Sequence, residues 1–548
     1  MKKIYIITLF VICLMLFGCG EHESINEHEH NFNQKVESIE FLKSSGTCID
    51  HNIYYYSCKC GEKGEETFEG TSFGNHDYEL KEIGEVGHVE VNECKYCHDM
   101  ECTSLPRIDI NTNGSEITEE YIQANISVSR CDDKYLLNNC LADVKIRGNG
   151  SAEYDKKPFR IKFSEKQMML GLNDDLKAKS WVLINEYHDR TRMHNVCAYY
   201  ISNYLFNHDG LYSTDMRFVE VYINGKYNGL YLLCEQQQVN KARINVYEAP
   251  KDYTGVDIGY FIEMDTYYYK EDESQTFAID YQYNLVYANG KTCKKSKFQN
   301  NYTIKSDIYS SEQNEFIKKV IQNIFFIMYD SLNNNHNNGY YTLDDNYDLI
   351  TDKSIKSSKE AIERVVDLRS YVDMFIIQDL AQNIDIGWSS FFMAFDASEK
   401  GSHKLIFEAP WDFDWAMGAS YPFKEGLFCV DQDTSGRHTT LTDYVNPWML
   451  MFANVDWFYD LVKDRWQELR QTNAIQDLFK AIDVLAYEYT SYFSSEFAKW
   501  PESMTKVLEK SIVCDEYTAH ATHFSAVEYL KNYLEQKIAY YDHIWLDE

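Results

Sequence analysis

Ile146-Arg147-Gly148-Asn149-Gly150-Ser151 is followed, after a short gap, by Phe159-Arg160-Ile161-Lys162-Phe163. In the second run apolar residues alternate with Arg160 and Lys162, so a strand would bury one face and present both cations on the other. Arg147 directly precedes the glycines. Three cations therefore converge on a glycine turn in a protein that is otherwise strongly acidic. Such a turn lets backbone amides approach phosphate oxygens, and we expect an anion site of this kind here.

The same cations have a second explanation. Glu153 and Asp155 lie in the gap between the two runs and could neutralise the cations by ion pairing. A Gly-Asn-Gly sequence is a weak signal when it stands alone. The order of the other motifs along the chain is therefore needed to choose between the two interpretations.

Strand-like and helix-like patterns alternate from Leu105 onward, without a proline-rich or glycine-rich linker. The clearest hairpin joins Phe218–Ile223 to Lys226–Glu235 through Asn224-Gly225, since Asn-Gly is the strongest short hairpin signal. Asp143–Arg147 and Phe159–Phe163 would form another strand pair, joined across Gly148-Asn149-Gly150-Ser151. Apolar residues recur at helical spacing in four segments, Arg190–Phe206, Glu312–Leu332, Leu368–Gln382 and Ala526–Ile544. We therefore expect one large α+β domain.

Two groups of carboxylates follow in the C-terminal half of the chain. Asp412 and Asp414 come after a predicted strand, Lys404–Phe407. Side chains two residues apart point the same way on an extended chain, and paired carboxylates suit a hard cation such as Mg²⁺. Asp385 lies at the end of a predicted helix, where its carboxylate could accept a proton from an incoming hydroxyl. Taken singly, acidic residues of this kind are more often solvated turns or helix caps.

The order of these motifs matches that of protein kinases. A glycine turn, a basic strand, a helix, a hairpin, a candidate base and an Asp-Phe-Asp turn correspond to the phosphate loop, lysine, helix, hinge, catalytic aspartate and metal aspartate. As a set, the motifs resemble the CotH (spore coat protein H) family of atypical kinases over roughly residues 105 to 545. The resemblance rests on Leu105-Pro106-Arg107-Ile108, Ile146–Ser151, Lys157–Phe163, Asn224–Glu235 and Trp411-Asp412-Phe413-Asp414.

This resemblance implies an atypical protein-kinase-like fold that binds ATP with Mg²⁺. It implies transfer of phosphate to serine or threonine hydroxyls of exported proteins. Asp385 would be the catalytic aspartate, and Asp412 would hold Mg²⁺ with help from Asp414. Ser390 departs from the ordinary kinase pattern, which places a second metal-binding asparagine at that position.

The resemblance also implies which residues bind the nucleotide. Lys162 would contact the phosphates, with Arg160 as the substitute for this role. Arg147 would add positive charge at the glycine turn. Glu235 closes the second strand of the predicted hairpin and would lie near the nucleotide.

The N-terminus has the pattern of a signal peptide. Lys2 and Lys3 precede an apolar stretch, Ile4–Phe17, which is too short to span a bilayer of about 30 Å. Leu16-Phe17-Gly18-Cys19 looks like a bacterial lipobox, so Cys19 would become the lipidated first residue of the mature protein. The alternative is an ordinary cleaved signal with an incidental cysteine. We expect an extracytoplasmic protein anchored to the bacterial cell membrane through Cys19.

These patterns predict three regions. Residues 1–18 would be the lipoprotein signal peptide, and residues 19–104 would contain the lipid anchor and two Cys/His-rich repeat modules. Residues 105–548 would form the CotH-like kinase domain.

The repeat modules are two copies of one degenerate unit. His30-Asn31-Phe32 aligns with His76-Asp77-Tyr78, and Cys58-Lys59-Cys60-Gly61 aligns with Cys94-Lys95-Tyr96-Cys97. The candidate ligands are His30, Cys48, Cys58 and Cys60 in the first copy and His76, His88, Cys94 and Cys97 in the second.

One candidate ligand is a cysteine in the first copy and a histidine in the second. A disulfide does not tolerate this exchange, whereas Zn²⁺ accepts both imidazole and thiolate. We therefore favour structural Zn²⁺ in residues 30–97. Disulfides stay the alternative, because an exported chain can oxidise its thiols. Either cross-link would stabilise modules that are too small to bury a large core.

The overall charge excludes some classes of partner. A formal net charge of -33 repels nucleic acid, so no nucleic-acid partner is expected. Two alternatives to a kinase are considered. One is a catalytically silent surface binding or adhesion protein on a kinase-like scaffold. The other is a carbohydrate-active protein, suggested by the 15% aromatic content and the many carboxylates.

Overall fold

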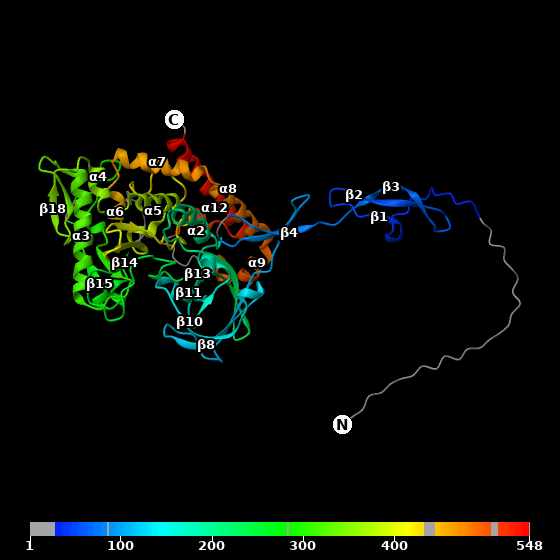
Figure 1. Ribbon diagram of the computed structural model, residues 1–548, viewed down its shortest axis with the longest axis horizontal. Coiled ribbons are helices and arrows are strands. Elements are labelled where there is room, and N and C mark those ends of the chain that lie inside the picture. The colour runs from blue at the N-terminus through cyan, green and yellow to red at the C-terminus, as the bar shows by residue number, and fades with distance from the viewer. Residues whose placement is uncertain (1–27, 85–86, 282–283, 432–443, 506–512, 547–548) are drawn as a thin grey trace, which may run out of the picture. The chain divides into compact units, whose positions relative to one another are not determined.

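The computed structural model describes residues 28–84, 87–281, 284–431, 444–505 and 513–546 (Figure 1). The predicted signal peptide and Cys19 lie outside the described residues. The chain divides into two compact units. The small unit is Met1–Glu79 with Cys94–Asp99, and the large unit is Leu80–Glu93 with Met100–Glu548.

The small unit is built on one antiparallel sheet with the strand order β1-β2-β3. Its strands are β1 (Leu42–Ser44), β2 (His51–Ser57) and β3 (Lys63–Phe73). Tyr54 and Phe68 are cross-strand partners whose buried rings stack at a centroid distance of 5.8 Å. Few other side chains of this sheet are buried, so its core alone offers little stabilisation.

A second three-stranded sheet has the order β4-β5-β6. Its strands are β4 (Tyr78–Glu82), β5 (Glu90–Cys94) and β6 (Met100–Cys102).

The first part of the large unit is a closed barrel of seven strands in the order β10-β11-β13-β12-β7-β8-β9. Within the barrel, β7 and β12 pair in parallel and the other neighbouring strands pair antiparallel. Alternate residues point into the barrel, where Ile126, Ile161, Trp181 and Leu233 belong to one buried apolar cluster. The strands are β7 (Arg107–Asn111), β8 (Ile122–Ser129), β9 (Leu137–Ile146), β10 (Phe159–Met168), β11 (Lys177–Ile184), β12 (Met216–Ile223) and β13 (Lys226–Glu235).

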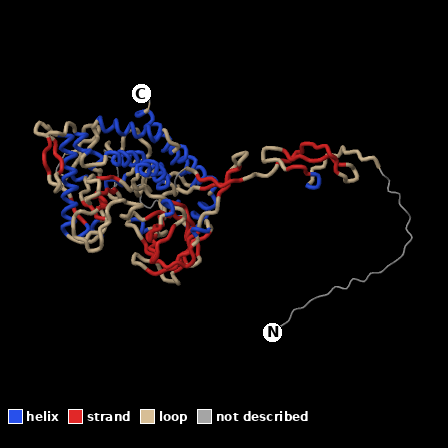
Figure 2. Tube along the Cα trace, in the orientation of Figure 1, coloured by secondary structure: helices blue, strands red, loops and turns tan. Residues whose placement is uncertain are grey.

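The second part of the large unit combines a five-stranded sheet, of order β15-β16-β14-β19-β20, with most of the helices. Figure 2 shows the barrel strands gathered in one part of this unit and the longer helices in another. The strands are β14 (Gly259–Met264), β15 (Thr276–Ala278), β16 (Asn301–Ile304), β19 (Phe391–Asp396) and β20 (Leu405–Phe407), and a separate hairpin joins β17 (Tyr340–Leu343) to β18 (Leu349–Asp352).

The longer helices belong to one continuous buried cluster with this sheet. Helix α3 packs beside β15 (Figure 1), and α5 contacts α2, α7 and α12. The helices are α2 (His194–Phe206), α3 (Ser311–Asn333), α4 (Ser358–Glu363), α5 (Leu368–Ala381), α7 (Asp456–Arg470), α8 (Ala474–Asp483), α9 (Thr490–Lys499) and α12 (His523–Trp545), with the short α1 (Leu172–Asp175), α6 (Pro447–Leu450), α10 (Glu502–Thr505) and α11 (Asp515–Thr518). Within the described ranges, none of the helices combines the length and hydrophobicity that a membrane span requires.

The structure confirms the α+β prediction and its clearest elements. The β12–β13 hairpin turns at Asn224 and Gly225, which both have positive φ, as a two-residue hairpin turn of this type requires. The predicted strands Asp143–Arg147 and Phe159–Phe163 pair with each other, with Arg160 opposite Lys145. Helix α2 begins at His194 and not at Arg190, where the sequence pattern predicted its start. The carboxylate of Asp189 accepts hydrogen bonds from the backbone N–H groups of Thr191 and His194, which holds the preceding residues in a turn.

A buried ionic cluster fixes helix α9 to the barrel. The Glu496 carboxylate contacts Lys156 Nζ at 2.6 Å and Arg192 Nε at 3.3 Å, and it accepts the backbone N–H of Leu230 at 2.8 Å. Burial lowers the pKa of Lys156 to about 8, against the opposing charge of Glu496. Gly229 has a φ of 130°, and a Cβ there would lie 2.6 Å from the carboxylate. Glycine therefore permits this approach.

Removing the carboxylate charge should destabilise the large unit. Glu496→Gln leaves Lys156 and Arg192 buried without their counter-charge, so we expect a loss of about 3–5 kcal/mol in the free energy of unfolding. Urea unfolding measures this change. Glu363→Gln, which breaks an exposed pair with Lys359, is the matched control and should change stability by about 0.5 kcal/mol or less. Equal effects of the two variants would contradict this account of α9.

Candidate functional site

One cavity of about 830 Å³ collects most of the predicted site residues of the large unit. Its lining includes the glycine turn Gly148–Ser151 and residues Gln236–Gln238, which follow β13. From the second part of the large unit it includes Asp385, Asp412 and Asp414. The structure therefore brings the glycine turn and the three aspartates to one cleft, although they are far apart in the sequence.

Asp385 lies just beyond the end of α5. Helix α5 ends at Ala381, and Gln382 takes the left-handed conformation with a φ of 47°. The side chain of Asn383 accepts the backbone N–H of Asp385 at 3.1 Å and donates to the backbone carbonyl of Asp412 at 3.2 Å. Asn383 therefore ties the Asp385 turn to the Asp412 turn.

The Asp-Phe-Asp turn is held from two sides. Asp412 has a φ of 69°, a conformation that is rare outside glycine, and its carboxylate accepts a 3.1 Å hydrogen bond from Ser390 Oγ. The backbone N–H of Phe413 donates to Asn195 Oδ1 at 2.9 Å. Asp414 pairs with His188 Nε2 at 2.7 Å. These contacts fix the direction of both carboxylates.

Burial makes the charge on Asp412 costly. Desolvation and the neighbouring Asp414 raise the pKa of Asp412 to about 7, although Arg147, Ser390 and His188 lower it. Burial also lowers the pKa of Arg147, whereas Asp412 raises it. For His188, burial lowers the pKa, but Asp414 outweighs this effect and the net change is upward. Such shifts are typical of functional sites.

Two of the predicted cations lie in the cleft. Arg147 and Arg160 both line it, and the Arg147 guanidinium lies 5.8 Å from the centroid of the Trp411 ring. The Nε atom of Arg160 is buried and has no hydrogen-bond partner among the described residues.

The structure places Lys162 and Glu235 outside the lining of the cleft. Lys162 is exposed beside the ring of Tyr121, because it lies two residues, or about 6.6 Å, farther along β10 than Arg160. Glu235 is fully buried and is bound by Arg243 Nε at 2.9 Å and by Asn173 Nδ2 at 2.8 Å. Its carboxylate is thus already used within the fold.

A network around Lys305 also lines the cleft and was not predicted. Lys305 Nζ lies 3.0 Å from Glu263, 3.4 Å from Asp265 and 3.1 Å from Glu271. Burial lowers the pKa of Lys305, but the three carboxylates outweigh it and raise the pKa overall. The backbone N–H of Ser390 donates to Glu263 at 2.9 Å, which connects this network to Asp412 through Ser390. Pairing between β14 and β16 assembles the network, and no local motif announces that pairing.

The small unit contains two clusters of potential metal ligands. The first comprises His28, His30, Cys58 and Cys60, and the second comprises Cys48, His76, Cys94 and Cys97. Within each cluster, all potential ligand atoms lie within 4.8 Å of one another.

This grouping corrects the prediction for two of the metal ligands, Cys48 and His88. Cys48 lies in the second cluster and not in the first, where His28 takes its place. His88 belongs to neither cluster, because carboxylates already engage both of its ring nitrogens. Its Nε2 lies 3.0 Å from Asp215 and its Nδ1 lies 3.2 Å from Glu82.

The fold and the cleft define a protein-kinase-like protein of an atypical kind. Its barrel carries a glycine turn and two arginines, and the helical part provides the three aspartates. Residues 144–541, more than half of the chain, match the family described as CotH kinase protein. The chain belongs to this family, so the predicted resemblance is confirmed. A search of curated proteins found no match.

Because the pKa of Asp412 is raised, replacing this carboxyl group should increase the folding stability. The unfolded carboxyl, with a pKa of 3.8, ionises before the folded one, whose pKa is about 7. Folding stability therefore falls as pH rises from about 4 to about 7. Asp412→Asn removes this loss and keeps an acceptor for Ser390. We expect the variant to be more stable than the natural protein by about 1–3 kcal/mol at pH 8, with a smaller difference at pH 4.

Urea unfolding at the two pH values measures this difference. A variant that is less stable than the natural protein at pH 8 would show that the Asp412 charge is compensated within the fold.

Proposed function

We propose that this protein transfers the γ-phosphate of ATP to serine or threonine hydroxyls of exported proteins. The observation that carries the proposal is the shared cleft, in which Asp385, Asp412 and Asp414 face the same cavity as Arg147 and Arg160. Membership of the CotH kinase protein family supports the same class of reaction. The lipobox-like sequence at Cys19 supports attachment to the outer side of the cell membrane.

The residues of the cleft fit a magnesium nucleotide. Arg160 Nε and Asp414 Oδ1 are both buried and lack a hydrogen-bond partner among the described residues. A donor and an acceptor of this kind suit a phosphate oxygen and a metal ion, respectively. Arg147, Arg160 and the backbone amides of the glycine turn would neutralise and orient the phosphates. Bound ATP with Mg²⁺ supplies the transferable phosphoryl group.

The aspartates have different roles in this proposal. Asp412 and Asp414 would hold Mg²⁺ through their carboxylates. Asp385 would orient the substrate hydroxyl and accept its proton. Asn383 acts as a positioning residue, because it contacts both the Asp385 and the Asp412 turns. Catalysis would then rest on positioning and charge neutralisation.

One observation favours a silent binding protein on the same scaffold. Ser390, which replaces the second metal-binding asparagine of ordinary kinases, donates to Asp412 and so occupies one of its oxygens. In this second candidate the cleft would hold a nucleotide without transferring phosphate.

Phosphate transfer from labelled ATP tests the first candidate. We expect transfer from the purified protein to itself or to serine-rich exported proteins, with a requirement for Mg²⁺. Asp385→Asn should lower the rate by about 10²–10⁴-fold through loss of the proton acceptor. Asp412→Asn should reduce transfer to background through loss of the metal.

Three further variants serve as comparisons. Asp345→Asn changes an exposed acid in the turn between β17 and β18 and should leave transfer unchanged. Arg160→Ala should raise the KM for ATP by about tenfold or more, whereas Lys162→Ala should not, because Lys162 lies outside the cleft lining. Transfer that survives in both Asp385→Asn and Asp412→Asn would refute the assignment. Nucleotide binding without transfer would support the silent candidate.

A further inference from the structure

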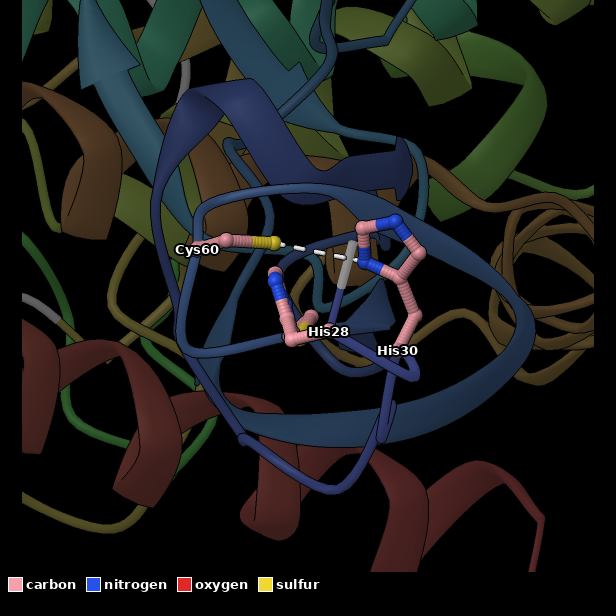
Figure 3. Close-up of side chains that lie close together, drawn as sticks. His28, His30 and Cys60 are labelled. Atoms are coloured by element: carbon pink, nitrogen blue, oxygen red, sulfur yellow. Dashed lines mark hydrogen bonds between the residues drawn. The ribbon is translucent and has the colours of Figure 1, made fainter. Parts of the chain in front are cut away.

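The first Cys/His cluster has the arrangement of a four-ligand metal site. His30 Nδ1 lies 3.4 Å from Cys60 Sγ, and His28 Nε2 lies 3.3 Å from Cys58 Sγ. Figure 3 shows His28, His30 and Cys60 directed toward a common centre. Cys58 is buried, whereas the other three are exposed.

The second cluster repeats this geometry. His76 Nδ1 lies 3.2 Å from Cys97 Sγ, so the same imidazole nitrogen faces the equivalent thiol in both copies. The supporting aromatic ring is also repeated. His30 stacks on Phe32 with centroids 5.6 Å apart, and His76 stacks on Tyr78 at 5.4 Å. The ring fixes each imidazole in a matching orientation.

These separations suit Zn²⁺ better than disulfides. Bonds of about 2.0–2.3 Å to a tetrahedral Zn²⁺ place ligand atoms about 3.3–3.8 Å apart. Cys48 Sγ and Cys94 Sγ are 3.5 Å apart, which is within that range and far longer than a disulfide bond of about 2.05 Å. Every cysteine among the described residues is free of disulfide bonds.

The second cluster differs from the first in the origin of one ligand. Gly74 occupies the position that His28 has in the first copy, so the second copy lacks that histidine. Cys48 replaces it from the turn between β1 and β2. The backbone N–H of Gly74 donates to Thr47 O at 2.8 Å, and a Cβ on Gly74 would collide with the carbonyl oxygen of Gly46. The absence of a side chain at Gly74 therefore lets the Cys48 turn approach.

We propose that the small unit binds two Zn²⁺ ions, one at His28, His30, Cys58 and Cys60 and the other at Cys48, His76, Cys94 and Cys97. The second ion is shared between the copies, because Cys48 belongs to the first and its other ligands to the second. Zn²⁺ would thus cross-link the β1–β2 turn to residues of the second copy. The ions are structural, since four protein ligands leave no open position for chemistry. This inference is independent of phosphate transfer.

Elemental analysis of the purified full-length protein tests the proposal, with thiol alkylation in parallel. We expect about two zinc ions per chain and thiols that react fully only after a strong chelator removes the metal. After dialysis against a weak chelator, Cys60→Ser should lose the first ion and Cys97→Ser the second. Cys48→Ser and Gly74→Ala should both weaken the second ion and spare the first.

Controls lie in the same segment. Cys102→Ser and His88→Gln alter residues outside both clusters, so both should retain two ions. Replacing Zn²⁺ by Co²⁺ should give thiolate-to-metal absorption that falls in Cys48→Ser, which shows direct ligation even where folding is unchanged. A metal-free protein with oxidised cysteines would overturn the zinc assignment. Unchanged zinc retention and Co²⁺ absorption in Cys48→Ser would overturn the shared site.

Discussion

The buried carboxylate of Glu496 is the constraint on which the large unit depends. It joins α9 to the barrel through Lys156 and the backbone of Leu230, and it also binds Arg192. The Arg192 guanidinium in turn donates to backbone carbonyls of Tyr187 and Asp189, so it shapes the turn that carries His188. Because His188 pairs with Asp414, the ionic cluster supports the cleft as well as the fold.

Within the cleft, amide side chains position the charged groups. Asn383 connects the turns of Asp385 and Asp412, and Asn195 holds the backbone of Phe413. Burial and Asp414 raise the pKa of Asp412, so its charge is costly, and its backbone has a rare conformation. Such a combination costs stability and is typical of sites that gain their compensation from a bound ligand. A cation between the two carboxylates would offset the burial and the repulsion by Asp414 that raise the pKa of Asp412.

The sequence predicted those parts of the site that have local signals. The glycine turn, Asp385 and the Asp-Phe-Asp turn could be recognised because each motif is short and their order is characteristic. Lys305 could not be recognised, because its partners reach it only through the pairing of β14 with β16. Cys48 was assigned to the wrong cluster for a similar reason. The Cys48 turn can approach the second cluster because Gly74 has no side chain. A glycine in the sequence does not show which residue will lie beside it.

The central claim is that the cleft holds a magnesium nucleotide between the glycine turn and the aspartates. Diffraction from crystals grown with a non-hydrolysable ATP analogue and Mn²⁺ tests it most directly. We expect an anomalous peak between Asp412 and Asp414 and phosphate density beside Arg147 and Arg160. A cleft without nucleotide density at saturating ligand, or an analogue bound elsewhere, would contradict the account.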